Sequence, residues 1–371
     1  MENSSGLSPR KLFHIREAGS YGSPERLIVG QITHARNFSG IPVSYRKGGV
    51  ENAFISELTS LKIPHLELTE HFTGDLTTSL RLAAMIRQYH PALIVTHEYK
   101  SNLYGYIASR MTGVPHLVHY HGVTAEDVKV RLYNAIDRWV LRRALGIVTV
   151  SSETKRRLVS AGVEESKINV VINAVADSAF EKVSFVNEEF DPAVPFAVCA
   201  GRLSHEKGVD ILIEALALLK HSGARLNCLI FGEGPEEEKI TSLIERHGLT
   251  DSAKLVGFQK DLRGPFRAMA FLIIPSRSEG FPLVLLEAWA QASPVVATPV
   301  GGLSDLIADN ENGILARAAE PKALAEAIQK ALNTPDFKSR CGQASERLVR
   351  EKYNFEIQVG RLEEIYERYA R

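Results

Sequence analysis

The sequence predicts an α/β protein with two doubly wound, Rossmann-like domains, because of its length, its alternating elements and a break near its middle. The chain has 371 residues, and a single hydrophobic core rarely extends beyond about 250–300 residues. Short β-branched runs alternate with amphipathic stretches, a pattern typical of parallel sheets covered by helices. A polar, proline-containing stretch, Val186–Pro195, interrupts this alternation. We therefore place the domain boundary after residue 187.

The predicted strands fall into two groups, one on each side of that boundary. They are Lys11–Ile15, Ile41–Tyr45, Ala92–Thr96, His116–Tyr120, Ile147–Val150 and Asn169–Ile172, then Pro195–Ala200, Asn227–Phe231, Phe271–Pro275 and Pro294–Ala297. The domains are then 1–187 and 188–353, with a cleft expected between them. The last segment, 354–371, is predicted to form an amphipathic helix that either closes the second domain or crosses back onto the first.

The composition excludes several classes of protein. Apolar residues make up 44% and charged residues 24% of the chain, as in ordinary globular proteins. Lys+Arg and Asp+Glu both number 44, so no net charge favours nucleic acid as a partner. Cys199, Cys228 and Cys341 are odd in number and widely spaced, which favours neither disulfides nor zinc. The sequence has no apolar run of membrane-spanning length and no apolar secretory leader, so we expect a cytoplasmic protein.

The strongest motif is the segment Ser276–Glu287, which follows a predicted buried strand and opens a helix. Open α/β sheets bind ligands at the carboxyl ends of their strands. Pro282 suits the first helical turn, where its missing N–H has no intrahelical partner to lose. The backbone N–H groups of Leu283 and Val284 are then free to point at an anion. The segment therefore predicts a phosphate-sized site at the start of this helix.

Charged side chains surround that predicted site. Glu279 stands in the loop before the helix and Glu287 lies one turn into it. Alternatively, these are a solvated loop acid and an N-terminal helix acid favoured by the helix dipole. Arg202 and Lys207 lie in another loop that follows a strand, Gly201–Gly208, and together offer a planar fork and a point charge to a diphosphate. Basic loops between strands and helices are common, so this feature alone is weak.

The order of these motifs resembles a known family. Three motifs in this order are similar to those of the retaining glycosyltransferases with the GT-B fold, called group 1 or family 4. They are Gly-Arg-Leu…Glu-Lys-Gly, then Gly-x-Gly-Pro at Gly232–Pro235, then Glu-x7-Glu. The similarity spans most of residues 195–315. It implies transfer of a hexosyl or N-acetylhexosaminyl group from a nucleotide sugar to a saccharide or lipid-linked acceptor. No cofactor is implied, because the nucleotide sugar is a substrate.

The resemblance also implies roles for single residues. Arg202 and Lys207 would hold the donor diphosphate, Glu287 the ribose hydroxyls and Glu279 the transferred sugar. Further donor contacts are implied for Gly232, Gly234, Phe258, Gly280, Phe281, Leu283 and Val284. The sequence contains no Asp-x-Asp motif of the kind that holds a catalytic metal, so no metal is predicted and the two cations must carry that electrostatic role.

The N-terminal half matches the family more loosely. Gly19 and Gly22 resemble a glycine loop near the acceptor and the donor phosphate, or they form a plain turn. His121 stands where the family places a histidine close to the donor sugar. His119 lies two positions earlier, on the same face of an extended strand, and is interpreted as structural. The catalytic candidates are therefore Glu279, His121, Arg202 and Lys207.

Some features leave alternatives open. Asn173–Asp177 and Ala292–Pro294 depart from the family pattern. The same fold could serve a nucleotide-sugar epimerase or hydrolase, or a non-catalytic subunit that binds nucleotide sugars. A dinucleotide oxidoreductase is disfavoured, because no G-x-G-x-x-G follows the first strand. The basic amphipathic stretch Lys129–Arg143 is either a packed helix with a solvated face or a peripheral contact with anionic membrane.

Overall fold

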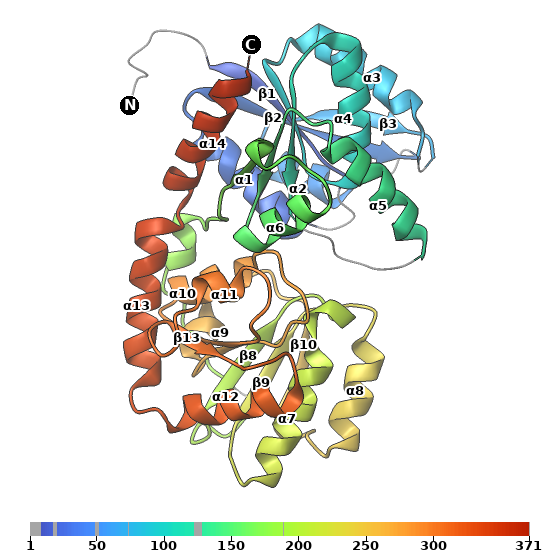
Figure 1. Ribbon diagram of the computed structural model, residues 1–371. Helices are drawn as coiled ribbons and strands as arrows, with labels where there is room; N and C mark the ends of the chain where they lie inside the picture. Colours follow the sequence, from blue (N-terminus) through green and yellow to red (C-terminus); the bar gives the residue numbers. More distant parts are fainter. Residues whose placement is uncertain are drawn as a thin grey trace. The chain divides into compact units, whose positions relative to one another are not determined.

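The computed structural model of the protein describes residues 9–17, 21–48, 52–72, 74–121, 128–187 and 189–370. Its internal contacts divide the chain into an N-terminal unit, Met1–Asn173 with Phe355–Arg371, and a C-terminal unit, Ala174–Asn354. Each unit contains one parallel β-sheet flanked by helices (Figure 1). The α/β class with two doubly wound sheets is therefore confirmed.

In the N-terminal unit, the described residues form a seven-stranded parallel sheet with the order β3-β2-β1-β4-β5-β6-β7. The strands are β1 Arg10–Ile15, β2 Phe38–Lys47, β3 Leu66–Glu70, β4 Leu93–Thr96, β5 His116–Tyr120, β6 Gly146–Thr149 and β7 Ile168–Val170. The helices are α1 Ser23–His34, α2 Ala53–Ser60, α3 Thr77–Tyr89, α4 Tyr99–Thr112, α5 Val128–Leu141, α6 Ser152–Ser160 and α14 Phe355–Tyr369. Side chains of Asn52 and Ser151 cap α2 and α6 by accepting backbone N–H groups, so these starts are fixed locally.

The sheet of this unit buries a different set of side chains on each face, as the two-residue repeat of a strand requires. Phe13 and Ile15 lie in a cluster with residues of α3 and α4, whereas Leu12 lies in a cluster with residues of α14. Leu12, Phe13 and Ile15 are each no more than 1% exposed. From Leu12 to Ile15, strand β1 is thus buried on both faces, which explains why apolar residues occupy both sides of the strand there.

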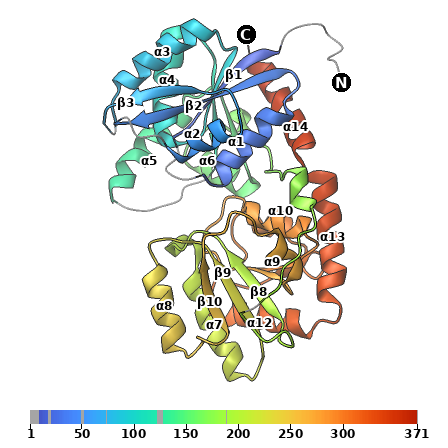
Figure 2. The same cartoon turned by 180° about the vertical axis from the view of Figure 1, so that it is seen from behind.

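Helix α14 packs on the N-terminal unit, which is one of the two positions left open by its sequence. Both views show it beside α1 (Figures 1 and 2). The buried Glu363 accepts backbone N–H groups of Arg36 and Asn37 at 2.8 and 2.7 Å. A Cβ atom at Gly30 would lie 2.0 Å from the ring of Phe355, so the two helices approach too closely for any larger residue there. These contacts tie the end of the chain to its first half.

In the C-terminal unit, the described residues form a six-stranded parallel sheet with the order β10-β9-β8-β11-β12-β13. The strands are β8 Phe196–Ala200, β9 Asn227–Phe231, β10 Ala253–Gly257, β11 Leu272–Ile274, β12 Val295–Ala297 and β13 Gly313–Leu315. The helices are α7 Val209–His221, α8 Glu237–Arg246, α9 Arg263–Ala268, α10 Leu283–Ala290, α11 Leu303–Leu306, α12 Pro321–Asn333 and α13 Phe337–Lys352. None of the helices in the described residues has the length and apolar character that a membrane span requires.

The division between the units falls at Asn173, ahead of the polar stretch at which the sequence places it. The segment 174–187 contacts helices of the C-terminal unit: Gln291 donates to the backbone oxygen of Glu181 at 3.0 Å, and Arg263 donates to that of Ser178, also at 3.0 Å. A polar sequence is therefore a poor guide to the boundary, because these bonds use backbone carbonyls that any sequence provides.

Both sheets have a point where the strand order reverses, and both points lie at a sheet centre. In the N-terminal unit β1 lies beside β4, and in the C-terminal unit β8 lies beside β11. The loops that leave such neighbouring strands run in opposite directions and open a crevice at their carboxyl ends, which is where open α/β sheets bind ligands. The residues that follow these four strands are therefore the candidates for function.

Candidate functional site

The C-terminal unit has a small pocket at the carboxyl ends of β8, β9 and β11. Arg202, Lys207, Ser276, Glu279 and Val284 line it, together with residues from the ends of these strands. All five are in motifs that the sequence singled out, and these motifs are about seventy residues apart in the chain. The reversal of strand order brings those loops together, which local sequence alone does not specify.

Lys207 and Glu279 are in direct contact within this pocket. The Lys207 Nζ atom donates to Glu279 Oε1 at 2.7 Å, and the Ser276 hydroxyl donates to the same oxygen at 2.7 Å. The Glu279 side chain is 6% exposed and that of Lys207 is 30% exposed. The buried carboxylate therefore has both a charge partner and a neutral donor, while the ammonium group keeps access to solvent. Arg202 is exposed at the rim of the same pocket.

Two glycines allow the loops of this pocket to approach one another. Gly232 has φ +132°, and a Cβ atom there would lie 1.9 Å from the backbone oxygen of Gly201. Gly301 has φ +58°, and its Cβ atom would lie 1.8 Å from the backbone oxygen of Glu279. Both positions combine left-handed backbone with contact distances that exclude any side chain. The sequence identified Gly232 but missed Gly301, whose lack of a side chain allows the loop of Glu279 to pack against it.

Helix α10 begins beside the pocket, with Leu283 as its first residue. Pro282 directly precedes that residue, so it lies just before the helix, whereas the sequence predicts it within the first helical turn. The first N–H groups of a helix have no carbonyl partner inside it, and Val284 in this first turn lines the pocket. Glu287 lies one turn further along α10 and is half-buried. The start of α10 thus offers N–H groups and a partial positive charge to an anion.

The remaining residues predicted on the donor side lie around these loops. The ring of Phe281 is buried and contacts that of Tyr353 edge to face, at 6.3 Å between centroids. The Gly280 carbonyl accepts the N–H of Gly302 at 3.2 Å. A Cβ atom at Gly234 would lie 2.3 Å from the backbone oxygen of Leu203. These three residues therefore shape the loops through packing and backbone contacts.

Phe258 is the exception to this pattern of burial. Its side chain is 62% exposed, directly after the edge strand β10. The preceding Gly257 accepts the N–H of Gly232 at 2.9 Å, which links the loop after β10 to the glycine turn after β9. An exposed aromatic ring next to a glycine turn is available to stack on a planar ligand.

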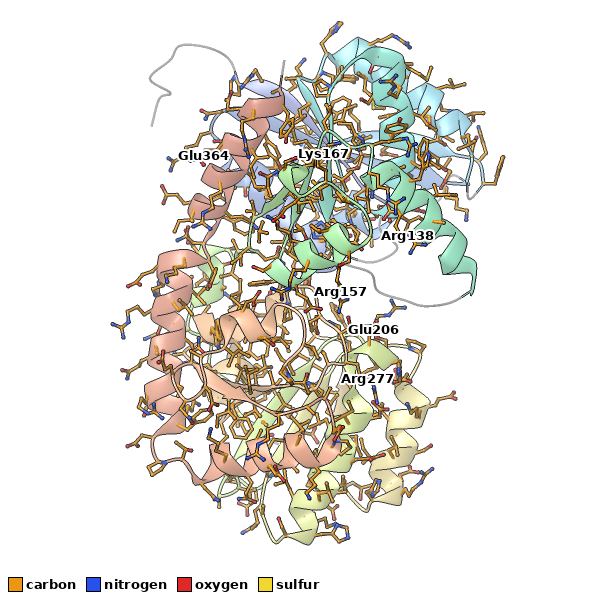
Figure 3. All side chains as sticks on the ribbon, in the orientation of Figure 1. Arg138, Arg157, Lys167, Glu206, Arg277 and Glu364 are labelled. Atoms are coloured by element: carbon orange, nitrogen blue, oxygen red, sulfur yellow. The ribbon has the colours of Figure 1, made fainter. Side chains whose placement is uncertain are left out.

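An ion pair missed by the sequence analysis joins the two loops of the pocket. Arg277 donates to both carboxylate oxygens of Asp210, at 2.7 and 3.0 Å, and to the backbone oxygen of His205 at 2.9 Å. Its own N–H donates to the Glu206 carbonyl at 2.8 Å, so the loops of Arg277 and Glu206 lie side by side (Figure 3). The hydrogen bonds from Arg277 and Lys239 lower the pKa of Asp210 to about 2 against the effect of burial. The pair therefore keeps its charges at neutral pH.

The pocket also contains a cysteine that takes no part in its electrostatics. Cys199, at the end of β8, lines the pocket and is buried. Burial raises the pKa of its thiol to about 12. A thiol that stays protonated at neutral pH is neither a nucleophile nor a metal ligand. The chemistry of the pocket therefore rests on its charged side chains and backbone N–H groups.

In the N-terminal unit, His121 directly follows β5 and contacts other histidines. Its Nε2 atom lies 3.3 Å from Nδ1 of His97, which directly follows β4. His119, on the same side of β5, interacts through its Nε2 atom with the hydroxyl of Tyr366 at 3.1 Å. The sequence thus placed His119 and His121 on one face as observed. A small pocket beside them is lined by Gln31, His119, His121, Asn173 and Gln358, among others.

The glycine loop before α1 is only partly described. Gly19 lies outside the described residues, whereas Gly22 immediately precedes α1. The N–H of Gly22 donates to Glu25 at 2.8 Å, and Glu25 forms a buried ion pair with Arg16. Arg16 also donates to the His97 carbonyl at 2.9 Å. Gly22 is therefore fixed to the same switch point as the histidines.

Several residues at this switch point were missed by the sequence analysis. His97 and Glu98 lie between β4 and α4, and Arg16 follows β1. Burial raises the pKa of Glu98 to about 7, although Arg16 opposes this shift. These residues follow β1 and β4, which are neighbours at the centre of the sheet, and that position could have identified them. The sequence predicted those strands but not their neighbours.

Two sets of side chains in the described residues place possible metal ligands within 4.8 Å of one another: His97 with His119 and His121, and His205 with Asp210 and Glu236. Both sets have cationic neighbours. Arg277 and Lys239 occupy the Asp210 carboxylate, and the Arg16 charge acts on His97. Neither set is therefore arranged to favour a divalent cation, and the absence of a metal remains a prediction.

Two family models match the chain. The model of glycosyl transferases group 1 matches residues 181–348, and the model of the glycosyl transferase 4-like domain matches residues 49–174. With the two parallel sheets described above, these matches define a glycosyltransferase with the GT-B fold. The chain belongs to the glycosyltransferases of group 1, as the resemblance of its motifs predicted.

Curated relatives agree with this assignment, and solved structures agree with the fold. The chain is 28% identical over 286 residues to 2-deoxystreptamine glucosyltransferase of Streptomyces kanamyceticus, covering 70% of this chain and 73% of that protein. It is 31% identical over 304 residues to D-inositol 3-phosphate glycosyltransferase of Acidothermus cellulolyticus, covering 73% and 66%. The structure of Anabaena HepE in complex with UDP has a TM-score of 0.81 at 21% identity, covering 97% of this chain and all of that one. Sucrose-phosphate synthase from Thermosynechococcus elongatus has a TM-score of 0.78 at 18% identity, covering 97% and 99%.

Proposed function

We propose that this glycosyltransferase retains anomeric configuration, needs no metal, and transfers a hexosyl or N-acetylhexosaminyl group from a nucleotide diphosphate donor. The observation that carries the proposal is the contact between Lys207 and Glu279 beside the start of α10. It places a solvent-accessible cation and a buried carboxylate in one pocket with Val284, from the first turn of α10. A diphosphate leaving group needs the cation and the N–H groups, and a developing positive charge at the sugar needs the carboxylate.

The roles follow from these positions. Lys207 and Arg202 stabilise the charge that grows on the diphosphate as the sugar leaves. The N–H groups at the start of α10 bind the phosphates. Glu287, one turn later, accepts hydrogen bonds from the ribose hydroxyls. When the donor binds, its diphosphate replaces Glu279 as a partner of Lys207, and the Glu279 carboxylate then faces the transferred sugar. The exposed ring of Phe258 stacks on the base.

The relatives suggest which substrates to test first. Structures of HepE contain UDP and UDP-glucose, so UDP-sugars are the first donors to try. The names of the two curated relatives point to cyclitols, one bearing amines and one bearing phosphate, as acceptors. Saccharides and lipid-linked sugars remain the broader acceptor class of the proposal, and a peripheral contact of the chain with anionic membrane would suit a lipid-linked one.

The test is a thermal-shift screen of the full chain with UDP, GDP and ADP and their sugars. A bound donor raises the melting temperature, because it binds the folded state alone. Lys207→Ala should reduce the shift, whereas Lys330→Ala should keep it. Lys330 is the matched control, since it also pairs with a carboxylate, Asp309, at 2.8 Å, but lies on α12 outside the pocket. No shift with any of these nucleotides would contradict the proposed donor class.

Product analysis then separates transfer from the alternatives. With a stabilising donor and a panel of acceptors, transfer yields a glycoside with the donor's anomeric configuration, which NMR coupling constants report. Free sugar or an epimerised donor, formed without any acceptor, would replace the proposal by a hydrolase or an epimerase. Binding without turnover would support a non-catalytic subunit instead.

A further inference from the structure

Three histidines form a continuous ladder at the switch point of the N-terminal unit. His14 is in β1, His97 follows β4 and His121 follows β5. His14 Nδ1 lies 3.0 Å from His97 Nε2, and His97 Nδ1 lies 3.3 Å from His121 Nε2. Both ring pairs are close to parallel, at 29° and 20°. His97 therefore uses both of its ring nitrogens on other imidazoles, while the Nδ1 atom of His121 points away from the ladder.

The surroundings keep the ladder uncharged. Burial lowers the pKa of His14 to about 3 and lowers the pKa of His97 and His121 well below the ordinary value. The Arg16 guanidinium, which donates to the His97 carbonyl, further lowers the pKa of His97 and His121. Each ring is therefore a neutral imidazole with one N–H donor and one lone-pair acceptor. A fourth ring, His119, packs edge to face on His97 but bonds to Tyr366 instead.

This geometry allows only two arrangements of the protons. If His14 donates from Nδ1, His97 accepts at Nε2 and donates from Nδ1, so His121 accepts at Nε2 and carries its own proton on Nδ1. If the direction is reversed, all three protons lie on Nε2. In either case the three rings have the same tautomer, because a neutral imidazole with an acceptor on one side is a donor on the other.

We infer that His97 is a positioning residue that fixes the tautomer of His121, and that His14 fixes His97 from behind. The outer Nδ1 atom of His121 is a donor in one arrangement and an acceptor in the other. Because the tautomers of the three rings change only together, the whole ladder, and not His121 alone, sets whether a hydroxyl of the donor sugar meets a donor or an acceptor. This consequence rests on the proposed function and on the family resemblance that places His121 close to that sugar, whereas the tautomer ladder itself does not.

The test is 15N NMR of the full chain labelled at histidine ring nitrogens, at pH 7.5 and without ligands. The ring shifts distinguish Nδ1–H from Nε2–H tautomers, and His14→Gln and His121→Gln assign the signals. We expect one shared tautomer for His14, His97 and His121. Different tautomers within the ladder, or a protonated ring, would overturn the inference. The parent spectrum decides this point, so the test does not depend on the stability of any His97 variant.

Variants then test what His97 does to His121. His97→Phe should turn the single His121 tautomer into a mixture, whereas Tyr366→Phe, which removes a hydrogen bond to His119 outside the ladder, should leave it unchanged. Once a donor has been identified, His97→Phe alone should lower kcat about tenfold. In a chain that already carries His121→Ala, the same substitution should have no further effect on kcat. A full tenfold loss in that background would show that His97 acts by another route. Absent turnover in the parent would contradict the proposed function and leave the NMR result standing.

Discussion

In the C-terminal unit the polar groups at the switch point are charged and one of them is open to solvent, since the Lys207 side chain is 30% exposed. In the N-terminal unit the histidines at the switch point are neutral and buried, with His14 and His97 each 3% exposed, and they lie beside the ion pair of Arg16 and Glu25. A charge with access to water can exchange its partner when an anionic ligand arrives, at a modest cost in free energy. A buried imidazole cannot exchange its partner in this way, because an unpaired buried ring nitrogen costs the full desolvation penalty.

The comparison teaches that the two switch points suit different parts of one reaction. The exchangeable contact of Lys207 with Glu279 suits a site where charge moves during the reaction. The fixed hydrogen bonds of the histidine ladder suit a site where orientation must not change. The variants and conditions below either break this distinction or make it sharper.

The largest expected effect is that of removing the exchangeable cation. Lys207→Ala should lower kcat about 10²-fold or more, because the leaving diphosphate loses a charge that grows in importance in the transition state. The fold should be retained, since the side chain is partly exposed. Steady-state kinetics of Lys207→Ala and Arg202→Ala, with circular dichroism as the control for folding, provide the measurement. Turnover within a few-fold of the parent in both variants would refute the diphosphate assignment.

The next effect separates the two glutamates. Glu279→Gln should lower kcat about tenfold or more with little change in donor affinity, because the charge that opposes the sugar cation is lost. Glu287→Gln should mainly raise the donor KM, since ribose contacts are equal in the ground and transition states. Kinetics and donor calorimetry on both variants test this division. The reverse outcome, with affinity lost at Glu279 and kcat lost at Glu287, would mean that sugar and nucleoside are placed the wrong way round.

The sequence predicted most of the fold but missed three strands, and all three are at sheet edges. Strands β3, β10 and β13 each lie at the end of a sheet. Their sequences, LELTE, AKLVG and GIL, are polar or very short. An edge strand has one neighbour and more solvent, so it needs no long β-branched run. The central strands, buried on both faces, have such runs and were found.

The candidate site shows the same limit. Arg202, Lys207 and Glu279 lie in short motifs with fixed spacing, so the sequence identifies them directly. His14 and His97 lie far apart in the chain, on strands whose neighbouring positions depend on the strand order of the whole sheet. No local pattern reports that order. The histidine ladder therefore became visible only in the folded chain.

The pH dependence of stability should report the buried histidines. The pKa values of His14, His116 and His119 are lowered to about 3 by burial, below the ordinary value of 6.5. Between these values the unfolded chain binds more protons, so stability is fully present above about pH 6.5 and falls as the pH decreases, by up to about 1.4 kcal/mol per pH unit and histidine. Glu98, whose pKa is raised to about 7, acts in the opposite direction, because its penalty disappears as it is protonated.

Because the lowered groups include His97 and His121 as well, the net effect is a loss of stability on acidification. Urea unfolding of the full chain at pH 7 and pH 5 should show a lower free energy of unfolding at pH 5. His205→Gln, at a largely exposed histidine, should leave the difference between the two pH values unchanged. Equal stability at both pH values would mean that the histidines are not held neutral by burial.

The smallest expected effect is that of a chelator, and it tests whether side chains alone provide the positive charge. The sequence has no Asp-x-Asp, and the Asp210 carboxylate near the pocket is already held by Arg277 and Lys239. A divalent ion would have to displace these cations, whereas Lys207 and Arg202 carry permanent charge at the pocket. Turnover with EDTA should therefore equal turnover without it. A strict requirement for added manganese would show instead that a metal stabilises the leaving group, and that Lys207 and Arg202 serve only to bind the donor.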